Sequence, residues 1–145
     1  MIRPPVIVSA CLVGLKTRHD GKEIQNSEVL ELLKGMAFIP VCPEQLGGLP
    51  TPRPAAEISG GRARDVLEGK AKVIDENGFD VTDGFLRGAR EVLKLAKLTG
   101  ATTAILKEKS PSCGVAFIYR NGAIVNGAGV LAELLQKEGI EVKGY

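Results

Sequence analysis

Short runs of β-branched and other apolar residues alternate with helical patterns along this chain of 145 residues. The runs that predict strands cover residues 6–10, 37–42, 102–106 and 140–143. Apolar side chains at helical spacing predict helices at residues 28–34, 82–98 and 130–137. Strands that alternate with helices favour an α/β fold, and we expect a three-layer Rossmann-like sandwich around a mainly parallel sheet.

The segments between these elements predict smaller features. Two Asn-Gly pairs predict small hairpins, over residues 71–81 and 116–125. Residues 43–61 are rich in proline and glycine and predict one long loop, which in a small domain is commonly functional. The length favours a single domain that spans residues 1–145.

The composition excludes several functional classes. A net charge of +2 argues against general binding to duplex nucleic acid, and four Phe and two Tyr are too few for a base-stacking platform. No apolar run approaches the roughly eighteen residues that a membrane helix needs. Residues 8–11 resemble a lipoprotein cleavage box, but the prolines at 4–5 leave too short an apolar stretch for a secretory signal. We therefore expect a cytoplasmic protein.

Three cysteines are the main functional signal. Cys11 follows the first predicted strand, Cys42 ends the second, and Cys113 lies in the loop after the third. The carboxyl ends of parallel strands lie at one edge of a sheet, and the crevice beyond that edge is where such folds bind ligands. The three thiols are therefore predicted to converge in one pocket, although three separately buried cysteines remain the alternative.

Three convergent thiols allow several kinds of chemistry. Together with His19 they could bind a tetrahedral zinc ion, although the sequence has no close C-x2-C pair of the kind that zinc sites favour. Alone they could hold a cubane iron–sulfur cluster, and one iron would then lack a protein ligand and remain open to substrate. A thiol nucleophile with a resolving thiol is the third possibility.

Three blocks of sequence carry a resemblance to a known family: VSACLVG at residues 8–14 with Arg18 and Asp20-Gly21, PVCPE at 40–44 with GGLPTPR at 47–53, and SPSCG at 110–114. Together they resemble the thiouracil desulfidase family, and the resemblance extends over residues 6–143. One departure is His19, where relatives commonly carry a tyrosine.

The resemblance implies a [4Fe-4S] cluster held by Cys11, Cys42 and Cys113, with the fourth iron left for the sulfur of a thiolated uracil. It implies that water replaces this sulfur without net redox change. It also implies that an acidic residue and a serine assist proton transfer, and these match Glu44 and Ser110. A carboxylate in a partly desolvated crevice is suited to such proton transfer. Alternatively, Glu44 and Ser110 only cap backbone groups of their loops.

Further side chains near these blocks are expected to bind the substrate, a thiolated pyrimidine base, nucleoside or nucleotide, with RNA left open. They are Arg18, Asp20, Arg53, Lys109 and Ser112. The cationic ones could meet a phosphate group, or could be ordinary solvated surface charges.

Two other functions compete with a desulfidase. The same three thiols could form a non-enzymatic metal or redox sensor. Alternatively, the Gly127-x-Gly129 turn could bind a nucleotide phosphate at a helix N-terminus. The chain ends at Tyr145, before the acidic residue of a dinucleotide site would follow, so we expect a tight helix entry at this turn instead.

Overall fold

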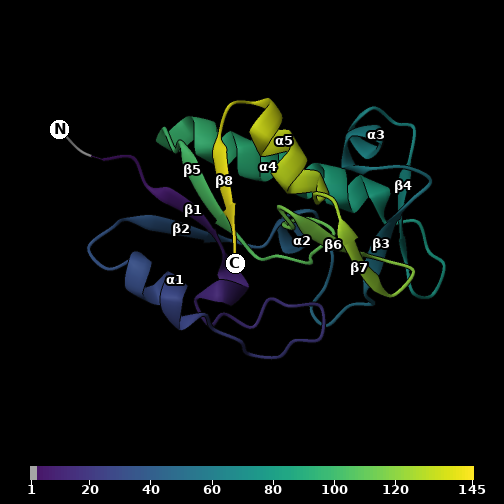
Figure 1. Cartoon of the computed structure of the whole chain (residues 1–145), viewed down its shortest axis with the longest axis horizontal. Helices are drawn as coiled ribbons and strands as arrows, with labels where there is room; N and C mark the ends of the chain where they lie inside the picture. Colours follow the sequence, from purple (N-terminus) through teal and green to yellow (C-terminus); the bar gives the residue numbers. More distant parts are fainter. Residues whose placement is uncertain (1–2) are drawn as a thin grey trace.

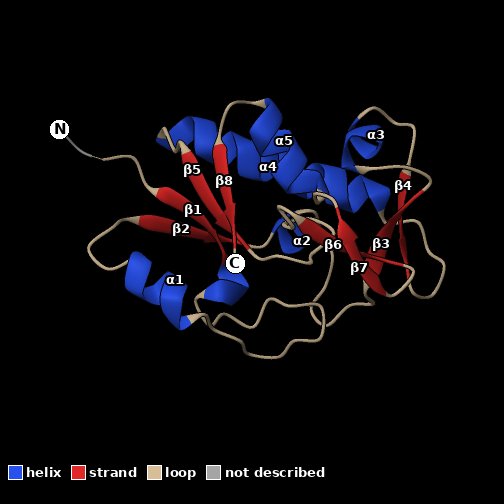
Figure 2. Ribbon diagram, viewed as in Figure 1, coloured by secondary structure: helices blue, strands red, loops and turns tan. Residues whose placement is uncertain are grey.

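The computed structural model describes residues 3–145 and is built around a four-stranded parallel sheet. The strand order is β2 (Phe38–Val41), β1 (Val6–Ser9), β5 (Thr103–Leu106) and β8 (Glu141–Gly144). Every neighbouring pair in this sheet runs parallel, as the alternation of strands and helices predicted. Figures 1 and 2 show the four strands side by side, with helices on both faces.

The helices cover the sheet in two layers. On one face, α1 (Ser27–Leu32) packs against Val6 and Val8 of β1 through Val29. On the other face, α4 (Thr82–Thr99) and α5 (Val130–Lys137) pack against side chains such as Ile7. Successive residues of β1 thus enter different cores, as expected for a strand that is buried on both faces. The predicted three-layer α/β sandwich is confirmed.

Local signals explain where several elements begin and end. The side chain of Asn26 accepts a hydrogen bond from the Val29 amide and caps α1. Gly100 adopts a left-handed conformation directly after α4. Pro40, which cannot donate a hydrogen bond to a neighbouring strand, lies in β2 at the edge of the sheet.

The prediction of one long loop over residues 43–61 is wrong. The segment contains the short helix α2 (Pro43–Leu46) and the strand β3 (Ala56–Ser59). The hairpin predicted over 71–81 is present in a short form: Ile74 of β4 (Lys72–Asp75) makes an antiparallel bridge to Asp80, and the Val81 amide donates to the Val73 carbonyl at 2.9 Å. The prediction did not include the pairing of β4 along its length with β3. The Asp75 carboxylate accepts hydrogen bonds from the Asn77 and Phe79 amides and curls the segment after β4 into a turn.

The predicted hairpin near the carboxyl-terminal end is present. It consists of β6 (Phe117–Arg120) and β7 (Ala123–Asn126), which form an antiparallel pair. Together with α3 (Ala63–Leu67), the two small sheets lie to one side of the main sheet (Figure 2). Among residues 3–145, no helix is both long and apolar enough to span a membrane.

Candidate metal centre and active site

Each of the three cysteines follows a parallel strand at its carboxyl end. Cys11 lies in the short 3-10 helix η1 (Ala10–Leu12) after β1, and Cys42 is the N-cap residue of α2, directly after β2. Cys113 lies in the turn that follows β5. All three line one cavity of about 1010 Å³, which extends from this edge of the sheet to the two small β-sheets. The fold therefore brings the three thiols to a common space.

The spacing of the donors in this cavity indicates what they can hold. The three cysteines are free, and Cys11 and Cys113 are buried. Among residues 3–145, no three His, Cys, Asp or Glu side chains lie close enough to bind a single metal ion, although His19 also lines the cavity. The arrangement therefore does not fit the tetrahedral zinc site considered above. Three thiols that line one cavity are a donor set for an iron–sulfur cube, in which each thiolate binds a different iron.

The surroundings of the thiols determine their ionisation. Burial raises the pKa of Cys11, Cys42 and Cys113, and it raises that of Cys113 most strongly. Several groups oppose this effect: Lys107 lowers the pKa of Cys11, backbone amides and Arg53 lower that of Cys42, and a hydrogen bond from Ser9 lowers that of Cys113. The thiols are therefore held protonated, and each would have to lose its proton to bind a metal.

The turn that carries Cys113 is held by hydrogen bonds to its backbone. Ser110 lines the cavity, and its Oγ accepts hydrogen bonds from the amides of Ser112 at 3.1 Å and Cys113 at 3.0 Å. The Ser110 hydroxyl proton is still available to a group in the cavity, because a hydroxyl can accept and donate at the same time. The predicted capping role of Ser110 is present, and it leaves a proton-donor role open.

The start of α5 also holds this turn. The Val130 amide donates to the Pro111 carbonyl at 2.9 Å, and the Leu131 amide donates to the Ser112 carbonyl at 2.8 Å. A Cβ atom at Gly129 would overlap the backbone of Ser112, so this close approach requires glycine. The helix N-terminus thus binds the cysteine turn. The nucleotide-phosphate site that the Gly127-x-Gly129 motif suggested is wrong for this reason.

A different contact positions Cys42 and Glu44. Helix α2 crosses α4 with backbone against backbone, because a Cβ at Gly88 would overlap the carbonyl of Pro43 and a Cβ at Gly47 would overlap the carbonyl of Gly84. Two glycines inside α4 cost helix stability, and this packing offsets that cost. As a result, the first turn of α2 places Glu44 beside the cavity.

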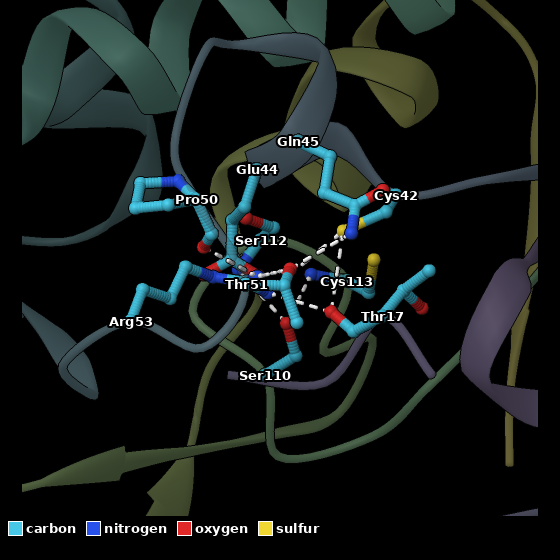
Figure 3. Close-up of polar contacts among 10 residues, drawn as sticks. All are labelled: Thr17, Cys42, Glu44, Gln45, Pro50, Thr51, Arg53, Ser110, Ser112 and Cys113. Carbon is cyan, nitrogen blue, oxygen red and sulfur yellow. Dashed lines mark hydrogen bonds and ion pairs between the residues drawn. The ribbon is translucent and has the colours of Figure 1, made fainter. Parts of the chain in front are cut away.

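Arg53 forms an ion pair with Glu44, with Nη2 and Oε2 separated by 3.0 Å (Figure 3). The two side chains are 5% and 14% exposed, respectively. Nη2 of Arg53 also lies 3.8 Å from the Cys42 sulfur. Glu44 thus faces a cation and not backbone amides, which differs from the capping alternative.

The other predicted substrate-binding residues are distributed unevenly. Arg18 and Lys109 line the cavity with Arg53, whereas Asp20 and Ser112 do not line it. Asp20 pairs with Arg18 at 3.0 Å and so acts on the cavity indirectly. Ser112 is buried, and its Oγ has no partner among the residues described. Binding of substrate by these residues stays a prediction.

The wall of the cavity opposite the cysteines was not predicted from the sequence. That wall comes from the small sheets and includes Glu57, Tyr119 and Arg120. The Glu57 carboxylate accepts hydrogen bonds from the amides of Asn121 and Gly122 and so fixes the β6–β7 turn. These residues are far apart along the chain and share no motif, so only the packing of β6 beside β3 reveals them.

Comparisons with known proteins find matches that extend along nearly the whole chain. The family model described as 2-thiouracil desulfurase matches residues 6–144. A Bacillus subtilis (strain 168) protein described as uncharacterized protein YbbK is 42% identical over 140 residues, which cover 94% of this chain and 93% of YbbK. Among solved structures, the [4Fe-4S]-dependent thiouracil desulfidase TudS is 39% identical, with a TM-score of 0.82, and the match covers 98% of this chain and 91% of that chain.

Proposed function

This chain belongs to the 2-thiouracil desulfurase family, and from that premise we propose that it removes sulfur from a thiolated pyrimidine at an iron–sulfur site. The resemblance that the three sequence blocks indicated is thereby confirmed. The observation that carries the proposal is that Cys11, Cys42 and Cys113 line one cavity together with Glu44 and Ser110. We expect the substrate to be a thiolated base, nucleoside or nucleotide.

The proposed reaction is a hydrolytic exchange. The carbon–sulfur bond of the ring breaks, a carbon–oxygen bond forms with water, and both protons of the water end on the departing sulfide. The products are the oxygenated pyrimidine and hydrogen sulfide, so no oxidant or reductant is consumed. The protein has to polarise the carbon–sulfur bond, accept a proton from water and return protons to sulfur.

Three cysteines would hold the cofactor, a [4Fe-4S] cluster, on which the similar desulfidase TudS depends. When bound, the cluster supplies an iron with an open position that prefers a soft sulfur atom to the hard oxygen of the normal base. Cys11, Cys42 and Cys113 would each donate one thiolate. Lys107 and Arg18 lie near Cys11 and lower the pKa of its thiol, so they would favour the thiolate form.

Two side chains would handle protons. Arg53 contacts Oε2 of Glu44, and the second oxygen of this carboxylate can accept a proton from water in the cavity. Ser110 holds its turn through its oxygen and can donate its hydroxyl proton to the ring or to the departing sulfur. Each group lies within three residues of a proposed ligand cysteine, Glu44 in the first turn of α2 after Cys42 and Ser110 in the turn of Cys113, so the acid–base groups would lie beside the cluster.

Anaerobic reconstitution tests this function. The protein should bind iron and sulfide, and with thiouracil in water enriched in oxygen-18 it should release sulfide and produce uracil that carries the heavy oxygen. Replacing each cysteine in turn by serine should abolish both cluster and turnover. A protein that binds only zinc, or a loaded protein that leaves thiouracil intact, would contradict the proposal. A loaded but inactive protein would instead favour the non-enzymatic sensor.

A further inference from the structure

Arg53 is the most extensively hydrogen-bonded side chain of the site. Its Nη1 donates to Thr51 Oγ1 at 2.8 Å and to the Pro50 carbonyl at 3.3 Å. Its Nη2 donates to the Thr17 carbonyl at 3.0 Å and to Glu44 Oε2 at 3.0 Å, and it contacts the Cys42 sulfur at 3.8 Å. Figure 3 shows these partners around the guanidinium group. Both terminal nitrogens are therefore committed to groups of the protein itself.

This arrangement is inconsistent with Arg53 as a docking point for a substrate phosphate. A guanidinium binds phosphate through two parallel N–H bonds, and that requires free terminal nitrogens. The Arg53 side chain is 5% exposed, and its Nε, the nitrogen without a partner among the described residues, is itself buried. The positive charge of Arg53 thus acts on its protein neighbours, of which Glu44 and Cys42 carry the proposed chemistry.

We propose that Arg53 is a positioning residue that fixes Glu44 relative to the Cys42 sulfur and offsets the negative charge that the two groups place beside each other. This inference rests on the proposed function, because it assigns to Glu44 and Cys42 the roles given above. One nitrogen, Nη2, contacts both groups, so the distance between carboxylate and sulfur depends on a single planar group.

Three separate segments meet at this guanidinium. The Arg53 amide donates to the His19 carbonyl at 2.7 Å, and the Thr17 carbonyl that accepts from Arg53 also accepts from the Cys42 thiol at 3.6 Å. Gln45 on α2 donates to Thr51 Oγ1 at 2.8 Å. A lysine carries the same charge but has one nitrogen, so it cannot hold the carboxylate, the sulfur and both loops at once.

The charge of Arg53 also predicts an electronic effect. A cation beside a ligand sulfur stabilises the more negative, reduced form of an iron–sulfur cluster, and such neighbouring contacts are known to tune the reduction potential. Loss of the cation should therefore make the potential more negative. A substitution that keeps the positive charge but removes the hydrogen bonds of the guanidinium should leave the reduction potential close to that of the wild type. Two substitutions separate these contributions.

The experiment compares Arg53→Gln, Arg53→Lys and the control Arg90→Lys in the anaerobically loaded full-length protein. Arg90 is an exposed residue of α4, so its replacement makes the same chemical change away from the site. We expect Arg53→Gln to lower both kcat and the reduction potential. We expect Arg53→Lys to lower kcat by about 10- to 100-fold, the usual effect of removing a contact behind a metal ligand, with a nearly unchanged potential.

A wild-type potential and a wild-type kcat in loaded Arg53→Gln would overturn the inference. A rise in KM with unchanged kcat would also overturn it, because it would indicate direct substrate binding. If Arg53→Gln fails to load, the combination of Arg53→Lys with Glu44→Gln decides. The lysine substitution should then cost little additional kcat, because its partner is already altered, whereas a full additional loss would contradict the inference.

A failure of this inference can be distinguished from a failure of the proposed function. If the loaded wild-type protein does not desulfurise thiouracil, the proposed function is wrong. The difference in reduction potential between Arg53→Gln and Arg53→Lys still reports whether the guanidinium acts on the cluster. Equal potentials in the two variants and the wild type would reject the electronic effect of Arg53 whatever the reaction.

Discussion

The segments that carry Cys42 and Cys113 reach the same cavity, but different kinds of contact hold them. The Cys113 turn is fixed through its backbone, by Ser110 and by the first amides of α5. The Cys42 segment leads into α2, whose backbone packs against α4, and it is held in addition by charged side chains, above all the buried ion pair between Arg53 and Glu44. A close contact between backbones is disrupted by added side-chain volume but not by a change of charge. A buried ion pair is disrupted most strongly by the loss of one of its charges.

This contrast suggests a division of roles. The backbone-held turn delivers a deeply buried thiol and one hydroxyl, and its geometry changes only if the chain itself moves. The Cys42 segment places the Glu44 carboxylate, the proposed acid–base group, beside the sulfur of Cys42, a proposed cluster ligand. Substitutions should therefore affect the rate of reaction on the Cys42 side and the assembly of the site on the Cys113 side.

The largest effect should come from Glu44→Ala. We expect kcat to fall by about 10²- to 10⁴-fold, the usual contribution of a general acid or base, while iron content stays near that of the wild type. Sulfide release and iron analysis of the same samples measure the two quantities. Glu138→Ala, a change at an exposed residue, serves as the control. Parallel loss of iron and rate would show that Glu44 is needed for assembly and would remove the contrast between the two segments.

Gly129→Ala should disturb the backbone-held turn. The new Cβ would overlap the Ser112 carbonyl, so we expect unfolding free energy to fall by about 1–3 kcal/mol and iron loading to decrease. Chemical denaturation of the ligand-free protein and iron analysis provide the measurements. Gly127→Ala is the matched control, because its Cβ would meet only the Ile118 side chain at 3.2 Å. Equal effects of the two substitutions would show that this contact does not hold the turn.

A smaller effect is expected from Glu108→Gln. The Glu108 carboxylate accepts hydrogen bonds from the amides of Val115, Ala116 and Phe117 and closes the segment after the Cys113 turn. A glutamine retains one carbonyl oxygen, so the loss should be roughly 1 kcal/mol of unfolding free energy. Denaturation curves measure it. A change in kcat with unaltered stability would place Glu108 in the reaction and not in the scaffold.

The mildest comparison concerns the reactivity of the thiols. Burial raises the pKa of the Cys42 and Cys113 thiols, and it does so more strongly for Cys113. The amides at the start of α2 and the charge of Arg53 partly oppose this effect at Cys42. At a given alkaline pH the ligand-free protein should therefore react with iodoacetamide more slowly than free cysteine, first at Cys42 and last at Cys113. Both rates should rise with pH as the thiolate fraction grows. Mass spectrometry after short exposures reads the order, and faster modification of Cys113 would reverse the comparison.

The sequence predicted the architecture because its signals are local. Apolar periodicity located α5 at residues 130–137 and α4 within about a residue at its end. The rule that parallel strands end at one edge then placed Cys11, Cys42 and Cys113 on the same side of the sheet. Nothing beyond the order of elements was needed for that step.

The tertiary structure decided what the side chains contact. The strand β3 and its pairing with β4 were missed because Ala56–Ser59 is short, lies among prolines and glycines, and gains its stability from a partner some distance along the chain. The sequence placed Arg53 near the crevice but did not predict its contacts with Glu44, Cys42 and Thr17. Local propensity and strand order follow from neighbouring residues, whereas the partners of a buried charge depend on which distant segments pack around it, and only the folded chain determines that.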